Sequence, residues 1–170
     1  MVKVFLYGID PEIWRRFSIA AGADFGALHR AIQDAMGWQD AHLHEFRHGK
    51  GKRLVDVIGP AEIGDAVPPG GTFRDEAQVT LATFVGRRAL PLRFLYRYDF
   101  GDEWLHEVVI EERTTGKAGK PVLLGGARAC PPEDCGGAWQ YARIAAGEHE
   151  WWEDEDWDPE LFRPAKVKFR

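Results

Sequence analysis

The sequence contains little cysteine, no long apolar run and no excess of positive charge. Its two cysteines, Cys130 and Cys135, are too few for the disulfide framework of a small secreted protein. No apolar stretch reaches the roughly 18 residues of a membrane span. The apolar start, residues 1–7, has neither the length nor the cleavage site of a signal peptide. These absences favour a cytoplasmic protein without a membrane partner.

Acidic residues outnumber basic ones, with 27 Asp and Glu against 22 Lys and Arg. The formal charge of −5 therefore gives no global positive field that would attract a phosphate backbone. The basic groups are dispersed, and only the turn at residues 50–53 could form a local patch. Nucleic acid is thus the least favoured partner, after a small ligand or another protein.

The composition is that of a globular protein of one domain's size. Apolar residues make up 45% and charged residues 29%, and seven Trp and ten Phe supply large surfaces for burial. Helical and alternating stretches follow one another irregularly, which favours α+β over a doubly wound sheet. We predict a single compact domain over residues 1–170, with a mixed or antiparallel sheet, a central β-hairpin and a few packed helices. The acidic, Trp-rich segment 148–170 is expected to pack on it.

The N-terminal part of the chain predicts a hairpin and one amphipathic helix. Residues 2–9 and 13–19 are apolar or alternating and flank a short turn, which indicates two paired strands. Asp24 is placed to cap the helix that follows, and Gly37 to end it. His29 lies off the apolar stripe, so we expect it at the rim or in solvent. The stripe consists of Phe25, Leu28, Ile32, Ala35 and Met36.

Residues 92–111 alternate most clearly and predict the central hairpin. We predict a three-residue loop at residues 101–103, because that register gives two cross-strand pairs of opposite charge. The expected pairs are Tyr98 with His106, Phe100 with Trp104, Arg93 with Glu111, and Arg97 with Glu107. The other expected elements are a strand at 42–47, an irregular connection at 56–78, a short helix at 80–85, a strand at 121–124, a helix from Pro131 through 138–146, and a helical turn at 158–162.

The stretch 98–106 concentrates acids, a histidine and aromatics at the end of this hairpin. Two other stretches, 42–46 and 130–137, are expected to converge on it. We therefore predict a polar pocket. Its members would be His42, His44, Tyr98, Asp99, Asp102, His106, Cys130 and Cys135.

A metal site is one interpretation of this pocket. His42 and His44 would share one face of a strand, and Asp102 and His106 would complete the ligand set of a divalent metal, zinc or manganese. Glu133 or Asp134 would then act as a catalytic base. The alternative is structural: the histidines form hydrogen bonds within the sheet and core, and Asp102 accepts bonds from amides of its own turn.

The cysteines and the acids between them also allow two interpretations. A thiol at the start of a helix has a lowered pKa, and Cys135 is the better placed nucleophile. The alternative is two reduced, partly buried thiols. Glu133 and Asp134 could instead cap the helix and offset its dipole.

Five motifs together resemble one known family. They are Trp14-Arg15-Arg16, Met36-Gly37-Trp38, the stretch 42–46, the stretch 98–106 and the stretch 130–137. In this order they are similar to the plasmid ORF-three-like family of the Ri-plasmid type, also labelled transposon passenger TnpR-like. The resemblance covers roughly the whole chain and implies an α+β domain, a mobile-element context and no established function. No serine- or tyrosine-recombinase arrangement supports the resolvase-like label.

Two functional hypotheses follow. The first is a cytoplasmic binding or interaction module that recognises a small ligand, an ion or a protein partner in the polar pocket. The second is a metal-dependent hydrolase or nuclease.

Overall fold

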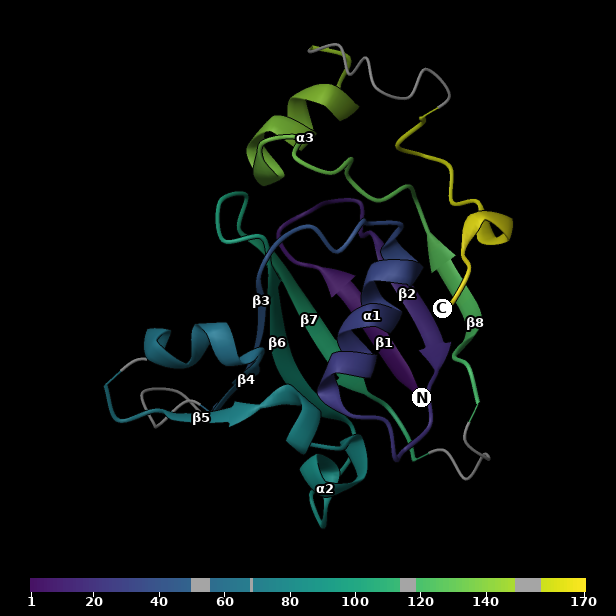
Figure 1. Ribbon diagram of the computed structural model, residues 1–170. Coiled ribbons are helices and arrows are strands. Elements are labelled where there is room, and N and C mark those ends of the chain that lie inside the picture. Colours follow the sequence, from purple (N-terminus) through teal and green to yellow (C-terminus); the bar gives the residue numbers. More distant parts are fainter. Residues whose placement is uncertain (50–55, 68, 114–118, 149–156) are drawn as a thin grey trace.

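An eight-stranded sheet with a long helix across one face forms the centre of the protein in the computed structural model (Figure 1). The structure describes residues 1–49, 56–67, 69–113, 119–148 and 157–170. The strands are β1 (Val2–Leu6), β2 (Trp14–Ser18), β3 (His44–His48), β4 (Asp56–Gly59), β5 (Thr72–Asp75), β6 (Leu92–Tyr98), β7 (Trp104–Ile110) and β8 (Val122–Ala127). The helices are α1 (Phe25–Met36), α2 (Leu81–Val85) and α3 (Gly137–Ala145), with short 3₁₀ turns η1 (Ala61–Ala66), η2 (Glu76–Gln78) and η3 (Pro164–Lys166).

The strands follow the order β5-β4-β3-β6-β7-β1-β2-β8. Neighbours are antiparallel except β4 and β5, which are parallel. The predicted α+β class, with a mixed sheet and a central hairpin, is therefore confirmed. None of the helices in the described ranges is both long and apolar enough to cross a membrane.

The N-terminal hairpin and helix α1 form as predicted. Strands β1 and β2 pair directly, with Val4 opposite Arg15. The side chain of Asp24 accepts a hydrogen bond from the Ala27 amide and caps α1, and Gly37 ends the helix with a φ of 92°. The apolar stripe of α1 packs against the sheet, so the core lies between α1 and the central strands.

The position of His29 contradicts the expectation that it lies at the rim of α1 or in solvent, and Gln33 lies beside it. Both are buried, with exposed fractions of 3% and 0%. Their side chains form hydrogen bonds with the Tyr96 hydroxyl under the helix. Burial is tolerated here because each polar group has a partner inside the protein.

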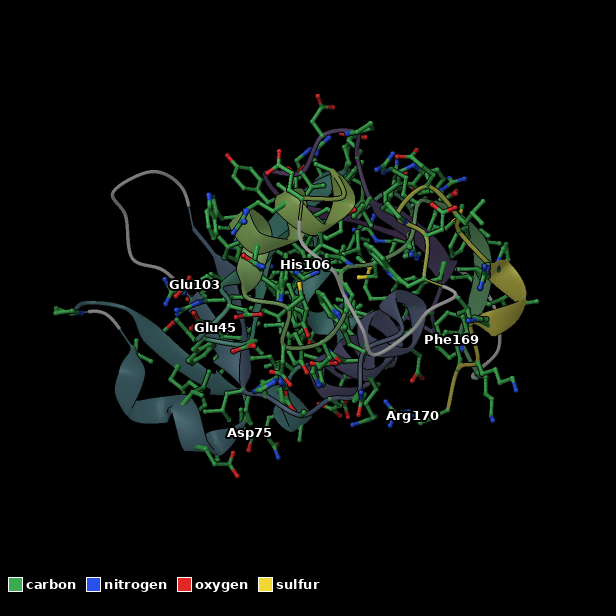
Figure 2. All side chains as sticks on the ribbon, turned by 90° about the horizontal axis from the view of Figure 1, so that it is seen from above. Glu45, Asp75, Glu103, His106, Phe169 and Arg170 are labelled. Atoms are coloured by element: carbon green, nitrogen blue, oxygen red, sulfur yellow. The ribbon has the colours of Figure 1, made fainter. Side chains whose placement is uncertain are left out.

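The central hairpin has a different register from the predicted one. Tyr98 lies opposite Trp104 and Tyr96 opposite His106, so the pairing is shifted by two residues and the loop spans residues 99–103. The shift keeps the side chains of β6 and β7 on their predicted faces, which is why the apolar pattern did not distinguish the two registers. Phe100, expected opposite Trp104, instead lies in the loop against Arg97. The loop requires left-handed conformations at Asp99 and Glu103 (φ 54° and 57°). The ion pairs therefore differ from the predicted ones: Arg16 pairs with Glu111, and Arg93 pairs with Glu107. Arg97 pairs with both Glu45 and Glu103. These two glutamates lie on the same side of the molecule (Figure 2).

Several predicted boundaries are wrong. Strand β3 begins at His44, which leaves His42 in the preceding loop, and residues 56–78 contain β4, β5 and two 3₁₀ turns. The helix expected from Pro131 begins at Gly137, because residues 131–136 form a turn. The short helix at 80–85 is confirmed as α2 with its Thr80 cap. The basic turn at 50–53, Trp151 and Trp152 lie outside the described residues.

The described part of the C-terminal segment lies beside β8 and α1 (Figure 1). The Trp157 indole donates to the Cys130 carbonyl, and the Phe169 ring packs on Phe17. The expected helical turn at 158–162 is a single hydrogen-bonded turn, from the Leu161 amide to the Asp158 carbonyl.

Candidate functional site

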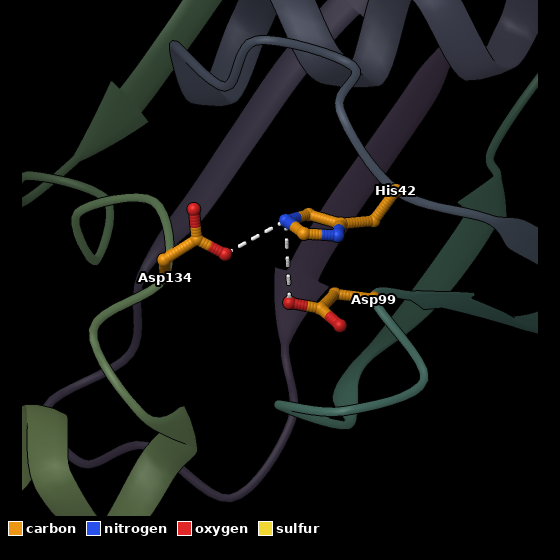
Figure 3. A group of neighbouring side chains, drawn as sticks. All are labelled: His42, Asp99 and Asp134. Carbon is orange, nitrogen blue, oxygen red and sulfur yellow. Dashed lines mark hydrogen bonds and ion pairs between the residues drawn. The ribbon is translucent and has the colours of Figure 1, made fainter.

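His42, Asp99 and Asp134 come together from three separate segments (Figure 3). His42 belongs to the loop before β3, Asp99 to the loop after β6, and Asp134 to the turn before α3. His42 Nε2 lies 2.8 Å from Asp134 Oδ1 and 3.7 Å from Asp99 Oδ2. One nitrogen or oxygen atom from each residue lies within 4.8 Å of the others. Within the described ranges, this is the one group of three or more His, Cys, Asp and Glu residues with that spacing.

Glu133 and Tyr98 form the inner wall of this acid–histidine site. The Tyr98 hydroxyl donates to Glu133 Oε1 at 2.6 Å and accepts from the Ala41 amide at 3.0 Å. Burial, together with the bond to Glu133, raises the pKa of Tyr98 well above its usual value. Glu133 Oε1 also lies 3.9 Å from His42 Nε2, and Oε2 accepts from the Gln39 amide. The tyrosine thus fixes the loop and one carboxylate in the same place.

The backbone of the surrounding loops orients the aspartates. Asp99 and Asp134 both have a φ of 54°, a left-handed conformation that aspartate tolerates better than most residues. Asp99 Oδ1 accepts bonds from the Gly101 and Asp102 amides, while Asp99 Oδ2 is the oxygen nearest His42. Asp102 Oδ2 in turn accepts from the Gly136 amide, which ties the hairpin loop to the turn before α3.

The site has a surplus of acidic groups. Among the described Lys and Arg side chains, none pairs with Asp99, Asp102, Glu133 or Asp134. The Asp99 and Glu133 side chains are only 10% and 11% exposed, whereas His42 is 31% and Asp134 68% exposed. The site is therefore closed on its inner side, open on its outer side, and electrostatically suited to a cation.

The predicted metal set of His42, His44, Asp102 and His106 does not assemble. His44 Nε2 faces Glu76 Oε2 at 2.6 Å, away from the His42 cluster. His106 is fully buried in the core (Figure 2), with Nδ1 against the Trp104 carbonyl. Burial lowers its pKa to about 3, so the ring stays neutral. Asp102 accepts from the Gly136 amide of another segment, not from amides of its own turn as the structural alternative expected. The core alternative fits His106, with a carbonyl as the partner of Nδ1.

His29 and His44 form a second histidine cluster. Their rings stack with centroids 3.4 Å apart and an interplanar angle of 4°. His29 bonds Asp40 Oδ1 at 2.6 Å and the Tyr96 hydroxyl at 2.9 Å. Burial, and next the neighbouring His44, lower the pKa of His29 to about 4, although Asp40 opposes this shift. This cluster was not predicted from the sequence; the available signal was His29 and Gln33 one helical turn apart beside the apolar stripe.

Both cysteines are buried. Burial, and then the charge of Asp102, raise the pKa of Cys135 to about 12, and burial also raises that of Cys130. The interpretation that gave Cys135 a lowered pKa is therefore wrong, because burial outweighs the position of the thiol just before the Gly136 cap of α3, and the alternative of two buried thiols fits. Glu133 and Asp134 likewise do not cap that helix and face Tyr98 and His42 instead.

A mainly antiparallel sheet with one long crossing helix and an acidic loop cluster defines an α+β domain protein. The family model described as "Plasmid pRiA4b ORF-3-like protein" matches residues 1–166, and the chain belongs to this family. The resemblance drawn from the five motifs is thus confirmed.

Two relatives have no established function. The "Uncharacterized protein y4hQ" of Sinorhizobium fredii is 37% identical over 145 residues, which cover 82% of this chain and 68% of that protein. The crystal structure of the "Protein of Unknown Function MM3350" from Methanosarcina mazei Go1 has a TM-score of 0.81 and 35% identity. The structural match covers 99% of this chain and 95% of the Methanosarcina mazei chain.

Proposed function

We propose that the protein is a binding module whose acid–histidine site, formed by His42, Asp99 and Asp134 with Glu133 beside them, binds a divalent cation. The observation that carries the proposal is the convergence of one imidazole and three carboxylates without a Lys or Arg partner among the described residues. Such a surplus of acid is stabilised most strongly by an added positive charge.

The spacing is close to that of a metal-ligand set. Nitrogen and oxygen ligands lie about 2.0–2.2 Å from zinc, so two of them are separated by at most about 4.4 Å. The three ligand atoms lie within 4.8 Å of one another, so a small movement of the exposed Asp134 side chain toward the half-buried His42 and the buried Asp99 would close the set. Binding would replace the direct His42–Asp134 bond with two metal–ligand bonds.

The ligand types favour zinc or manganese over magnesium. Imidazole suits zinc and other transition metals, whereas magnesium prefers an all-oxygen octahedral shell. The intrinsic order of affinities places zinc above manganese. We therefore expect zinc to bind most tightly, manganese less tightly and magnesium weakest.

Isothermal titration calorimetry with each ion tests the proposal. The expected result is one zinc per chain, with affinity reduced about tenfold or more in His42→Ala and in Asp134→Asn, since each removes one ligand. Glu62→Gln, an exposed acid outside the site, is the matched control and should bind like the parent protein. Binding that survives both site substitutions would reject the assignment.

A metal-dependent hydrolase or nuclease is the second candidate, favoured by the open outer side of the site and by a third carboxylate. Glu133 is the nearest additional carboxylate, and its Oε1 lies close enough to His42 Nε2 to serve a metal-bound water as base. Cleavage of bis(4-nitrophenyl) phosphate by the zinc- or manganese-loaded protein, lost in Glu133→Gln while metal binding persists, would support it. If the metal site is saturated and the phosphodiester is not cleaved, the hydrolase hypothesis is rejected and the binding module remains.

The cytoplasmic location and the mobile-element context stay predictions, because no contact of the site bears on either. Nucleic-acid binding also stays a prediction. Arg15 is buried and Arg16 bonds Glu111, so neither offers a free cation at the surface.

A further inference from the structure

A second cavity lies between the end of α1 and the C-terminal segment, with a volume of about 380 Å³. Its walls come from the end of α1, the Cys130–Pro132 stretch and residues 157–167. This volume falls within the range of small-molecule sites, roughly 300–1,000 Å³. Of the residues of the acid–histidine site, only Glu133 also lines this cavity, so the two sites adjoin at that carboxylate.

Aromatic and apolar side chains form much of the wall. Trp38 and Trp157 are held by hydrogen bonds from their indole nitrogens to the carbonyls of Pro131 and Cys130. Phe162 lies against the Arg15 guanidinium at 4.1 Å, and Leu161 remains 48% exposed beside it. Trp38 is buried and stacks on Tyr98, so the half-buried Trp157 is the indole that offers a flat surface on which a planar apolar body can pack.

Arg15 is a buried cation in this wall without a carboxylate partner. It is 2% exposed, and its guanidinium donates four hydrogen bonds, all to backbone carbonyls. No described Asp or Glu forms an ion pair with it, and one of its five N–H groups has no acceptor within the described ranges. Carbonyl dipoles satisfy the hydrogen bonds but leave the positive charge uncompensated.

Two further cations line the cavity. Arg163 and Lys166 are exposed and have no ion-pair partner among the described residues. The acidic wall residues are already bonded: Asp34 to Arg170, Glu133 to Tyr98 and Gln39, and Asp158 to the Glu160 amide. Of these acids only Asp34 is paired with a cation, whereas Glu133 and Asp158 are bonded to uncharged donors and keep their charge. Three cations (Arg15, Arg163 and Lys166) therefore face two unpaired carboxylates, which leaves the cavity with an excess of one positive charge.

We propose that this cavity binds a small organic anion with a planar, apolar body. The body packs against Trp157, Leu161 and Phe162, and the carboxylate or phosphate pairs with Arg163 and Lys166 in the field of Arg15. Charge-assisted hydrogen bonds from these two side chains give the anion its advantage over a neutral molecule of the same shape.

Calorimetric titration of the full chain with 2-naphthoate and 2-naphthyl phosphate tests this assignment, with neutral 2-naphthamide as the matched probe. We expect saturable one-to-one binding of at least one anion. The amide should bind with an affinity at least about tenfold lower than that of this anion. The double variant Arg163→Gln/Lys166→Gln should lose about tenfold in affinity for the anion. The control Arg87→Gln/Lys168→Gln removes two exposed cations outside the cavity and should bind like the parent protein.

The substituted positions are at the surface, so the variants should keep the parent's thermal unfolding temperature. Equal affinity for the anion and the amide, unchanged anion binding in Arg163→Gln/Lys166→Gln, or no saturable binding of either anion would overturn the proposal. None of these outcomes depends on the metal site, because the titrations are made without divalent ions.

Discussion

The two histidine clusters contain the same chemical groups in opposite arrangements. In the inner cluster, His29 and His44 stack on each other, and each ring has one carboxylate, Asp40 or Glu76. In the outer cluster, the single ring of His42 faces several carboxylates and is 31% exposed. The inner groups satisfy one another and are sealed, so they serve stability. The outer groups carry surplus charge and remain open, so they suit a ligand.

The largest expected effect on stability is in the inner cluster. His29→Ala leaves the Tyr96 hydroxyl and Asp40 without their imidazole partner and opens a cavity beside His44. We expect a loss of about 3 kcal/mol in the free energy of unfolding, measured by urea denaturation. The matched control is His42→Ala in the outer cluster, which should change that free energy by less than about 1 kcal/mol. Equal losses in the two variants would remove the distinction between the clusters.

The inner histidines also predict a pH dependence. The pKa values of His29 and His106 are lowered to about 4 and about 3, so between these values and the usual 6.5 the unfolded chain binds more protons than the native one. Stability must therefore fall as the pH drops below about 6.5, by up to about 1.4 kcal/mol per pH unit for each histidine.

Unfolding free energies measured between pH 7 and pH 4.5 check this sign. In His106→Leu, one of the two proton-linked slopes is absent, so the curve should be flatter than that of the parent protein. An equally steep curve in the variant would show that His106 does not contribute to the linkage.

A smaller effect is expected where the outer site joins the core. Tyr98→Phe removes the hydroxyl that bonds Glu133 and the Ala41 amide, and we expect a loss of about 1–2 kcal/mol in unfolding free energy. Tyr7→Phe is the control, since Tyr7 is 65% exposed, and its effect should stay within about 0.5 kcal/mol. A loss no larger than the control's would mean that this bond does not hold the loop.

The smallest effect on stability is expected at the rim of the outer site. Asp134→Asn keeps a side chain that tolerates the left-handed conformation and removes one charge from an acidic surplus. We expect unfolding free energy to change by less than about 0.5 kcal/mol in the absence of metal. Zinc affinity should nevertheless fall by about tenfold. A stability loss as large as that of His29→Ala would show that Asp134 stabilises the fold, as the inner cluster does.

Local patterns in the sequence predicted the elements that depend on one periodicity. The alternation of Ile13, Phe17 and Ile19 and the apolar stripe of α1 each identify a buried face without knowledge of the rest of the chain. The hairpin register could not be obtained in this way, because a two-residue shift keeps Tyr96 and Tyr98 on the same face. The left-handed conformations of Asp99 and Glu103, which accompany the longer loop, cannot be predicted from the alternation of apolar and polar residues.

The candidate site was predicted in outline but not in its membership. Three stretches around His42, Tyr98 and Glu133 were expected to converge, and their side chains do meet. Spacing along a presumed strand placed His44 beside His42, whereas His42 lies in a loop and His44 faces helix α1. The partners of His44 and His29 come from distant elements, and contacts of that kind are not encoded in local spacing.

The most direct test of the divalent-cation proposal is nitrogen-15 NMR of the histidine side chains during a zinc titration. Coordination changes the chemical shift of the bound ring nitrogen, so each histidine reports separately. We expect the His42 Nε2 resonance to shift and to saturate at one zinc per chain, while the signals of His29, His44 and His106 stay in place. A zinc-dependent shift at His29 or His44 with His42 unchanged, or no shift at His42 at all, would contradict the proposal.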